Sequence, residues 1–304
     1  MIKVRVPATT ANIGPGFDAF GMAFQLYNIF SFEERDNGKL TIRGVERRYQ
    51  GKSNLVYKAM LKVFNRVHYR PKGIYIYTDV NIPVSRGLGS SAACIVGGLV
   101  GANTLCGAPL TGKELFDMAV EMEGHPDNVA PAMFGGLVVS LGLKEENHYI
   151  KKEVSQCFEF YGLIPDFTLS TMEARKALPK KVFHKDAVFN VSRATMTYLA
   201  LTEGRPDILK VSVEDKLHQP YREGLIAHYD EVSQKARELG ALNTCISGAG
   251  PTILAITTRD NDQFYAKMGK YLKEKLPGCT LLKLEPDNTG VCTARHSYGG
   301  SYDT

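Results

Sequence analysis

Alternating apolar and polar residues predict strands at several places along the chain. In residues 2–6, Ile2, Val4 and Val6 alternate with basic residues, which is the pattern of a strand with one buried face. Similar short patterns predict further strands at 40–45, 74–78, 135–141, 158–163, 167–171, 252–257, 280–284 and 290–294. The predicted strands are therefore spread over both halves of the chain.

Apolar residues at helical spacing predict helices between these strands. Residues 53–67 carry apolar side chains at 55, 56, 59, 60, 63 and 64, close to a period of 3.6 residues. Thr111 and Glu114 have the spacing of a capping box, which starts a helix that ends near Gly124, before Pro126. Further helices are expected at 94–100, 186–201, 227–239 and 262–276.

The second half of the chain predicts an α+β arrangement of its own. A polar and charged segment at 142–152 separates the halves, so we expect domains of residues 1–150 and 151–304. Strands and helices alternate in the second half, which favours helices on one face of a sheet. The helix at 186–201 carries Val188, Val191, Thr195 and Tyr198 or Leu199 on one face. The polar segment 296–301 is expected to fray.

The composition is that of an ordinary globular protein of 304 residues, 44% hydrophobic and 23% charged. No apolar run is long enough to cross a bilayer, and residues 1–6 read as a strand and not as a signal peptide, so we expect a cytoplasmic protein without a membrane partner. The net charge of +5 is mild and no basic block is interleaved with aromatic residues, which argues against nucleic acid as a partner. Six scattered cysteines lack metal-knuckle spacing and are expected to be reduced.

A loop rich in glycine and serine joins the strand at 74–78 to the helix expected at 94–100. Its residues are Pro83, Val84, Ser85, Arg86, Gly87, Leu88, Gly89, Ser90, Ser91, Ala92 and Ala93. Such a turn at a helix start exposes main-chain N–H groups next to the positive end of the helix dipole, and so binds anions, most often phosphate. Gly87 and Gly89 permit close approach of a ligand, so a valine at position 89 is expected to block phosphate and leave the fold largely intact. The two serines add hydroxyls for phosphate or a metal ion.

Other loop types share parts of this pattern. A Walker A loop requires a lysine after its second glycine, and none follows Gly89. The spacing Gly87-x-Gly89-x-x-Ala92 fits a loose dinucleotide fingerprint, but the segment about 20 residues further on is a loop without the acidic residue that this fingerprint needs. A nucleophile elbow requires a glycine where Ala93 stands. A purely structural role, as a tight turn that packs a helix on a sheet, is the remaining alternative for this loop.

Two further loops carry polar groups beside glycines. Asn12 and Asp18 lie in a loop stiffened by proline and glycine after the first strand, where they could hold a small polar ligand or act as ordinary turn residues. Ser247, Gly248 and Gly250 lie in a second glycine-rich turn. That turn is either a hairpin connection or another anion-binding nest.

A cluster of acidic residues surrounds a histidine just after a predicted helix end. Glu121 and Glu123 precede His125, and Asp127 follows it. Oxygen ligands suit Mg²⁺ better than zinc, and phosphate loops commonly act with Mg²⁺. A hydrolase triad of Ser91, His125 and Asp127 is conceivable, although the missing elbow and the short spacing argue against it. A solvated helix end is the purely structural alternative.

These four segments, taken in their order along the chain, resemble segments of the GHMP superfamily of small-molecule kinases. More narrowly, PATTANIGPGFD at 7–18 and EGHPDNVAP at 123–131 resemble the homoserine kinase branch of that superfamily. The similarity extends to about residue 294. It implies a two-domain α+β GHMP kinase architecture, with an N-terminal domain like a ribosomal-protein domain with a left-handed β-α-β unit and a ferredoxin-like C-terminal domain. ATP and substrate would meet between the two domains.

The resemblance also implies a role for each polar cluster. Relatives bind ATP along residues 83–93, and we expect Ser247, Gly248 and Gly250 at the same nucleotide site. Ser91 and Glu123 match groups placed next to Mg²⁺, with Glu121 as the alternative metal ligand. The residues expected to contact the substrate are Asn12, Asp18, Asp127, Asn128, Arg175 and Arg222. The arginines would grip a carboxylate, and Asp18 would pair with an ammonium.

The implied reaction moves the γ-phosphoryl group of ATP to the side-chain hydroxyl of L-homoserine and gives O-phospho-L-homoserine, a step of threonine synthesis. Ser91, Glu123 and Asp127 are the expected catalytic residues, and the existence of a general base stays open. A kinase of the same superfamily that acts on another alcohol, such as mevalonate, is the alternative enzyme. A nucleotide-binding sensor without turnover is the alternative of another class. A homodimer is one option for the assembly.

Overall fold

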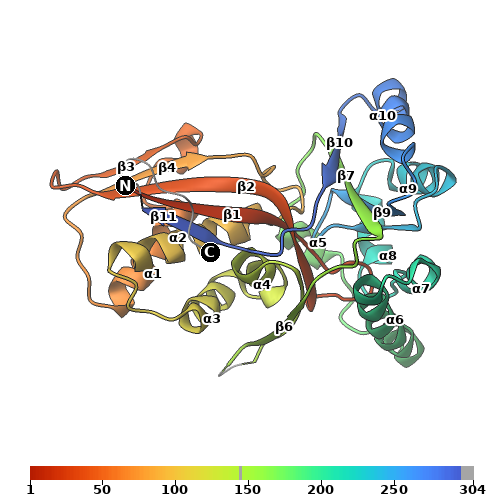
Figure 1. The fold of residues 1–304 in the computed structure, drawn as a ribbon, viewed down its shortest axis with the longest axis horizontal. Helices are drawn as coiled ribbons and strands as arrows, with labels where there is room; N and C mark the ends of the chain where they lie inside the picture. The colour runs from red at the N-terminus through yellow and green to blue at the C-terminus, as the bar shows by residue number, and fades with distance from the viewer. Residues whose placement is uncertain (144–145, 296–304) are drawn as a thin grey trace.

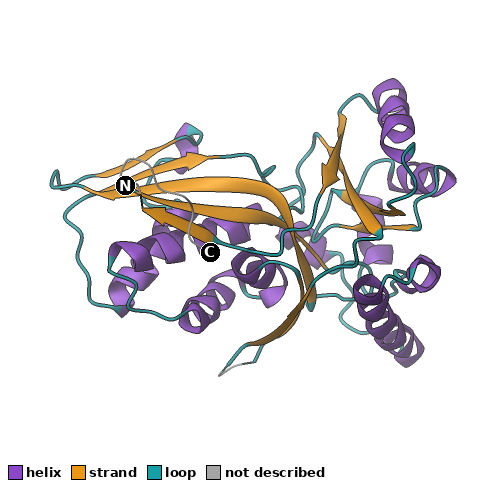
Figure 2. Cartoon of the chain, in the orientation of Figure 1, coloured by secondary structure: helices purple, strands orange, loops and turns teal. Residues whose placement is uncertain are grey.

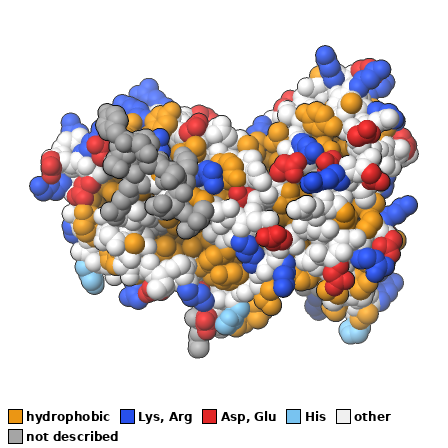
Figure 3. Space-filling model, in the orientation of Figure 1, with side chains coloured by type: hydrophobic (Ala, Val, Ile, Leu, Met, Phe, Trp, Pro, Cys, Tyr) orange, Lys and Arg blue, Asp and Glu red, His pale blue; other side chains and the backbone are white. Residues whose placement is uncertain are grey.

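A computed structural model describes residues 1–143 and 146–295 of the chain. The segment 296–301, which the sequence predicts to fray, lies outside these residues. Two lobes lie side by side in Figure 1, the first half of the chain on the left and most of the second half on the right. Figure 3 shows that the surface is hollowed between the lobes and that acidic and basic side chains are mixed on this face. None of the described helices is both long enough and apolar enough to span a bilayer.

The first sheet has seven strands in the left lobe and continues below it. The order β11-β1-β2-β4-β3 forms its main path, and β5 pairs with both β2 and β6. Its strands are β1 (Ile2–Ala11), β2 (Phe20–Glu34), β3 (Leu40–Arg43), β4 (Ile74–Asp79), β5 (Leu137–Leu141), β6 (His148–Lys152) and β11 (Cys292–Arg295). β3 and β4 are parallel neighbours joined through a helix, whereas the other pairs are antiparallel. The left-handed crossover that the resemblance implies stays a prediction.

Helices cover one face of the first sheet (Figure 2). They are α1 (Leu55–Arg66), α2 (Ser90–Leu105), α3 (Gly112–Glu123) and α4 (Pro126–Phe134), with the short 3-10 helix η1 (Arg47–Tyr49) before them. α2 packs closely because its side chains are small: a Cβ added at Gly97 or Gly101 would overlap the rings of Phe30 and Phe32 on β2. The helices expected from the spacing at 53–67, 94–100 and 111–124 are confirmed.

The second sheet has four antiparallel strands in the right lobe. They are β7 (Phe158–Pro165), β8 (Asn243–Ile246), β9 (Ile253–Thr258) and β10 (Cys279–Leu284), in the order β10-β7-β9-β8. The helices are α5 (Thr171–Lys176), α6 (His184–Glu203), α7 (Pro206–Ser212), α8 (Gln219–Arg222), η2 (Glu223–Leu225), α9 (Tyr229–Glu238) and α10 (Phe264–Lys275). With β7 as strand 1 and β10 as strand 4, the order 4-1-3-2 is that of the ferredoxin-like arrangement expected from the resemblance.

The strand predicted at 167–171 is wrong. Ser170 instead caps α5: its side chain accepts a hydrogen bond from the Glu173 amide, and Glu173 accepts one from the Ser170 amide. The preceding residue, Leu169, donates its amide to Ser85 of the glycine-rich loop. This segment therefore ends in a capping box and a loop contact, and it does not pair with a strand.

Two strands complicate the expected division of the chain. β6 spans residue 150, and β11 returns from the second lobe to pair with β1. The two sheets also share a hydrophobic core, in which Phe24 of β2 contacts Phe160 of β7. Domains of residues 1–150 and 151–304 stay a prediction, and the end of the described chain belongs to the first sheet.

Candidate active site

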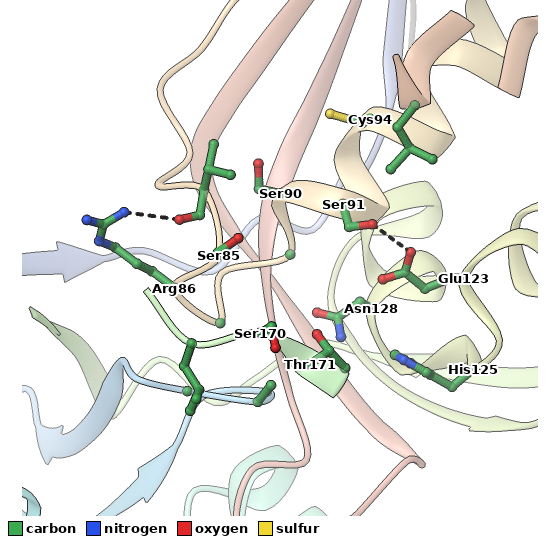
Figure 4. Close-up of a pocket in the computed structure, with 18 of the residues that line it drawn as sticks. Ser85, Arg86, Ser90, Ser91, Cys94, Glu123, His125, Asn128, Ser170 and Thr171 are labelled. Atoms are coloured by element: carbon green, nitrogen blue, oxygen red, sulfur yellow. Dashed lines mark hydrogen bonds between the residues drawn. The ribbon is translucent and has the colours of Figure 1, made fainter. Parts of the chain in front are cut away.

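A cavity of about 370 Å³ lies where the two lobes meet. Its walls come from the loop between β1 and β2, the start of α2, the turn between α3 and α4, α5, α8 and the turn between β8 and β9. Figure 4 shows part of this cavity, with Ser91 at the start of α2 pointing toward Glu123, and with His125 and Asn128 on the same side as Glu123. Polar groups that are far apart in the sequence therefore converge on one space.

The start of α2 presents unpaired main-chain donors. Gly89 is the N-cap with a left-handed φ of 68°, and Ser90 is the first helical residue. Within the described residues, the amides from 87 to 92 donate no hydrogen bond to the protein, and Ala93 donates to Gly89. Gly87, Gly89, Ser90 and Ser91 line the cavity. This is the geometry of an anion site at a helix N-terminus.

Not all of the loop reaches the cavity. Leu88, Ala92 and Ala93 are fully buried in the core, and neither they nor Pro83 line the cavity. Any contact of the buried three with a nucleotide would be through the main chain. These residues hold the loop in place, since an apolar anchor on each side fixes the turn between them.

Gly87 and Gly89 are required by packing within the protein, whereas the sequence indicates only that they allow a ligand to approach. A Cβ at Gly89 would overlap the hydroxyl of Thr9, and a Cβ at Gly87 would overlap the carbonyl oxygen of Ser247. Both glycines also have positive φ, of 68° and 76°. The expectation that a valine at 89 leaves the fold intact is therefore wrong, because the new side chain would meet the protein before it met a ligand.

Arg86 fastens the loop to the second lobe. Its guanidinium donates to the carbonyl oxygens of Pro165 at 3.0 Å and Asp166 at 2.5 Å, and to that of Val84 at 3.0 Å, which Figure 4 draws as a dashed line. Ser247 fastens it from another side, because its hydroxyl donates to the carbonyl of Gly87 at 2.6 Å. Ser247 itself does not line the cavity, whereas Gly248 and Gly250 do.

Ser91 and Glu123 form the pair expected at a metal ion. The Ser91 hydroxyl donates to the Glu123 carboxylate at 2.9 Å across the gap between α2 and α3 (Figure 4). Burial raises the pKa of Glu123, and the hydrogen bond from Ser91 opposes that shift. Glu121 instead pairs with Lys62 at 2.5 Å, has a side chain 72% exposed, and is not part of the cavity wall. The oxygen pair at Ser91 and Glu123 therefore fits a hard cation such as Mg²⁺.

Asp127 and its neighbours form a second acidic group. His125 Nδ1 lies 2.5 Å from Asp127 Oδ1, and Asn128 donates to the same oxygen at 3.3 Å. Burial lowers the pKa of His125, but the hydrogen bond and charge of Asp127 outweigh it and the net shift is upward. Ser91 bonds to Glu123 and not to this histidine, so the hydrolase triad is not formed. Ligand atoms of Asp18, His125 and Asp127 lie within 4.8 Å of one another, which makes them a second possible cation group.

Asp18 and Arg175 pair with each other across the two lobes. The two guanidinium nitrogens of Arg175 donate to the two carboxylate oxygens of Asp18 at 3.0 and 2.7 Å. This hydrogen bonding raises the pKa of Arg175. Each side chain is about one-third exposed and lines the cavity, so an incoming charged ligand can reach both.

Arg222 is buried, only 2% exposed, and still lines the cavity. Its guanidinium donates to the carbonyls of Ala174 and Gly248, each at 3.2 Å. Burial, and then the positive charge of Arg175, lower the pKa of Arg222. Among the described residues no carboxylate is hydrogen-bonded to this guanidinium, and a buried guanidinium of this kind is suited to an anionic ligand.

His218 contacts the Arg222 guanidinium and helps to fix its position. Its Nε2 donates to the carbonyl of Gly14 at 2.7 Å, which leaves Nδ1 as an acceptor 3.4 Å from an Arg222 nitrogen. Phe17 stacks on the His218 ring at 5.1 Å and lies under the Arg222 guanidinium at 5.0 Å. Burial lowers the pKa of His218, which favours the neutral form that this arrangement needs.

Asn12 and Asn128 use their amides within the protein. Asn12 donates to the carbonyl of Gly248 at 2.8 Å and accepts from the Asp18 amide at 3.0 Å. The Asn128 oxygen accepts from the Thr9 hydroxyl at 2.8 Å. Both residues line the cavity, and both also brace the loops that form it.

Part of the cavity wall is not predicted by the sequence. Apolar and amide side chains contribute to it: Val45, Tyr49, Asn54, Leu55, Val56 and Val80. They come from separate segments and share no motif, so only the folded chain brings them together. A flat apolar ring such as a nucleobase fits a wall of this kind.

Comparisons with known proteins show what this chain is similar to. A family model described as GHMP kinases N terminal domain matches residues 54–136, and one described as GHMP kinases C terminal matches residues 200–274. A homoserine kinase of Clostridium botulinum (strain Eklund 17B) is 47% identical over 292 residues, which cover 96% of this chain and 98% of the relative. A homoserine kinase of Clostridium beijerinckii has the same identity and coverage.

Solved structures give the same result for the fold. The crystal structure of a homoserine kinase from Cytophaga hutchinsonii has a TM-score of 0.85 at 28% identity, and the match covers 96% of this chain and 97% of that one. The mevalonate kinase of Methanococcus jannaschii has a TM-score of 0.71 at 13% identity, covering 94% of this chain and 98% of that one. The second likeness is one of fold alone.

Proposed function

Since this chain belongs to the homoserine kinases of the GHMP kinase family, we propose that its cavity binds ATP and L-homoserine and transfers the γ-phosphoryl group to the homoserine side-chain hydroxyl. The product is O-phospho-L-homoserine, an intermediate of threonine synthesis. One observation carries the proposed site: unpaired amides at the start of α2 share a single cavity with two arginines and two aspartates. The first set suits phosphate, and the second suits a zwitterion.

The nucleotide half of the site is the loop at 83–93. The amides from 87 to 92 would bond to the phosphate oxygens, and the positive end of α2 adds to the attraction. Because Arg86 and Ser247 already hold the loop, these donors are oriented before ATP arrives. The apolar residues of the cavity wall, among them Tyr49 and Val84, would contact the adenine ring.

Ser91 and Glu123 would hold Mg²⁺ beside the phosphates. When bound, the ion would neutralise part of the negative charge of the phosphates. The hydrogen bond between Ser91 and Glu123 places both side-chain oxygens beside the loop at 83–93. Burial raises the pKa of Glu123 because its negative charge is poorly compensated. A cation at this position would stabilise that charge.

The substrate half of the site matches the two charges of homoserine. Arg222 is fixed by the protein and offers its charge to a carboxylate, while Arg175 and Asp18 neutralise each other until a ligand arrives. We expect the zwitterion to take over this pair, its carboxylate bonding to the arginines and its ammonium to Asp18.

Asp127 suits positioning better than proton abstraction. Its Oδ1 already accepts from Asn128 and lies 2.5 Å from His125 Nδ1, and both contacts hold the carboxylate in place. The hydroxyl proton can leave late in a loose phosphoryl-transfer transition state, in which alignment and charge neutralisation do most of the catalysis. A general base is not required by this arrangement.

A coupled assay of ADP release tests the proposal. With ATP and Mg²⁺, L-homoserine should support turnover, whereas mevalonate and shikimate at equal concentration should not. Turnover with mevalonate alone would favour the alternative kinase. ATP binding without turnover of any of these alcohols would favour the nucleotide-binding sensor. Cytoplasmic residence stays a prediction of the sequence.

A further inference from the structure

Thr9 lies where the first strand passes the loop at 83–93. It is fully buried on β1 and does not itself line the cavity. Its main-chain N–H donates to the carbonyl oxygen of Leu88 at 3.2 Å, and a Cβ at Gly89 would overlap its hydroxyl. The loop that the cavity uses for an anion is therefore held against this one residue of the strand.

The side chain of Thr9 holds an amide that belongs to another wall of the site. Its hydroxyl donates to Oδ1 of Asn128, in the first turn of α4, at 2.8 Å. Among the described residues, no other group donates to that oxygen. The Asn128 nitrogen Nδ2 donates to Asp127 Oδ1 at 3.3 Å, which is the longer and weaker of the two contacts. Thr9 is therefore the main constraint on the direction of this amide.

The bond from Thr9 decides which end of the Asn128 amide is presented to a ligand. A primary amide has one oxygen that accepts and two N–H groups that donate. Thr9 occupies the oxygen and Asp127 takes one N–H, so the second N–H has no partner among the described residues, and Asn128 lines the cavity. An N–H donor suits a hydroxyl or phosphate oxygen, whereas a reversed amide would present its own oxygen and repel a phosphate.

Thr9 also ties the two sides of the proposed reaction to one rigid element. Its main chain contacts the loop proposed to bind the ATP phosphates, and its side chain contacts Asn128, which the resemblance places at the substrate. The residue pairs with Ala23 of β2 within the first sheet, and side chains on such elements are held more precisely than side chains on loops. Phosphoryl transfer depends on the alignment of donor and acceptor, so a small displacement of either side is costly.

We propose that Thr9 is a positioning residue for phosphoryl transfer. Its hydroxyl holds the Asn128 amide with the free N–H directed at the acceptor hydroxyl of the substrate, and its main chain holds the loop at 83–93 at a fixed distance from that amide. One lone pair of the acceptor oxygen then accepts from Asn128, and the other stays available for the γ-phosphorus. This inference rests on the proposed function, because it assigns a role within the same site.

Steady-state kinetics with ATP, Mg²⁺ and L-homoserine test this role. Thr9→Val should lower kcat by about 10- to 100-fold and leave the KM for ATP nearly unchanged, because the alignment acts in the transition state and not in nucleotide binding. Thr9→Ser keeps the hydroxyl and should retain most of the kcat, a rescue that a purely space-filling role would not give. Thr257→Val is the matched control and should leave kcat unchanged. Thr257 is equally buried, on β9, and its hydroxyl has no hydrogen-bond partner among the described residues.

A double-variant cycle separates positioning from packing. Asn128→Ala alone should lower kcat by about 100-fold, and adding Thr9→Val to it should cause little further loss, because the hydroxyl acts only through that amide. Thr9→Ala also removes the hydroxyl and gives the same comparison if Thr9→Val fails to fold.

Three results would overturn the inference: a wild-type kcat in Thr9→Val, a Thr9→Ser variant as slow as Thr9→Val, or losses that multiply in the double variant. Its failure can be told apart from failure of the proposed function. A wild-type protein that is inactive with homoserine overturns both, whereas an active wild type with an unaffected Thr9→Val variant overturns this inference alone.

Discussion

Gly89 carries two constraints that act together. Its φ of 68° lies in the left-handed region, and its Cα is packed against Thr9 on β1. The residue thus fixes the position of the helix start relative to the first strand. The amides on either side of it can then point into the cavity without any side chain in the way.

Gly89→Ala should lower both stability and ATP affinity. The new methyl group overlaps the Thr9 hydroxyl, so we expect a loss of about 2–4 kcal/mol in the free energy of unfolding. Gly107→Ala is the control, because Gly107 has a φ of 85° and open space around it, and should cost only about 1 kcal/mol. Denaturant unfolding compares the two variants. Equal losses would show that packing against Thr9 does not matter.

Glu123→Gln should weaken the response to Mg²⁺. The substitution keeps the shape of the side chain and removes its charge, so the Mg²⁺ concentration for half-maximal activity should rise by about 10- to 100-fold. Glu121→Gln is the matched control and should leave it unchanged, since Glu121 pairs with Lys62 outside the cavity. A titration of activity with Mg²⁺ reads out both. A larger effect at Glu121 would assign the ion to that carboxylate.

His218→Leu should raise the KM for homoserine by about tenfold and leave the KM for ATP unchanged. The leucine removes the acceptor behind Arg222 and leaves the Gly14 carbonyl without its donor. His218→Gln can supply one donor and one acceptor, so it should recover part of the affinity. Steady-state kinetics with each substrate varied in turn gives the answer. A change confined to ATP would contradict this role.

The sequence predicts the residues that line the site better than the residues that hold them in place. Ser91, Glu123 and Asp18 stand in motifs, and the structure brings all three to one cavity together with Arg175. The supporting role of Arg86 was not predictable, because it depends on carbonyl oxygens of a strand end about eighty positions away. Long-range contacts of this kind leave no local pattern.

Among the elements, α3 is tied to the segment before β6 by one carboxylate. Asp117 accepts hydrogen bonds from the amide and the side chain of Asn147, at 3.2 and 2.8 Å, and from Lys113 at 2.7 Å. Burial raises the pKa of Asp117, but these hydrogen bonds outweigh it and the net shift is downward. A carboxyl group with a lowered pKa stabilises the folded state only while it is ionised.

Asp117→Asn should therefore cost about 1 kcal/mol of unfolding free energy at pH 7, a modest figure because the side chain is about one-third exposed. The wild type loses this advantage as the pH falls from about 4 through the lower pKa of the folded state, so the difference between the two proteins should shrink by pH 3. Urea unfolding at both pH values measures it, with Glu146→Gln as an exposed control. A difference that grows toward low pH would contradict the assignment.

The elements that the sequence predicts best are those with a regular pattern and a clear cap. The helix opened by the Thr111 capping box is found as expected, while the capping box at Ser170 follows apolar residues that on their own predict a strand. β2 was missed because its burial pattern changes part-way along its fifteen residues. The spacing of the apolar residues predicts that they share one face of α6. The spacing alone does not show that this face is exposed to solvent.

The two lobes are joined by the same features that form the site. Arg86 links the phosphate loop to the end of β7, Asp18 reaches Arg175 on α5, and β11 carries the chain back to the first sheet. Neither lobe alone contains both halves of the cavity. The resemblance predicted this two-lobed arrangement, whereas composition and periodicity reached only an α+β class.

The structure of the protein with a non-hydrolysable ATP analogue, Mg²⁺ and L-homoserine tests this account most directly. We expect the triphosphate against the amides from 87 to 92, the homoserine carboxylate on Arg175 and Arg222, and its hydroxyl pointing at the γ-phosphate. A triphosphate bound away from the start of α2, or a homoserine whose carboxylate contacts neither arginine, would contradict it.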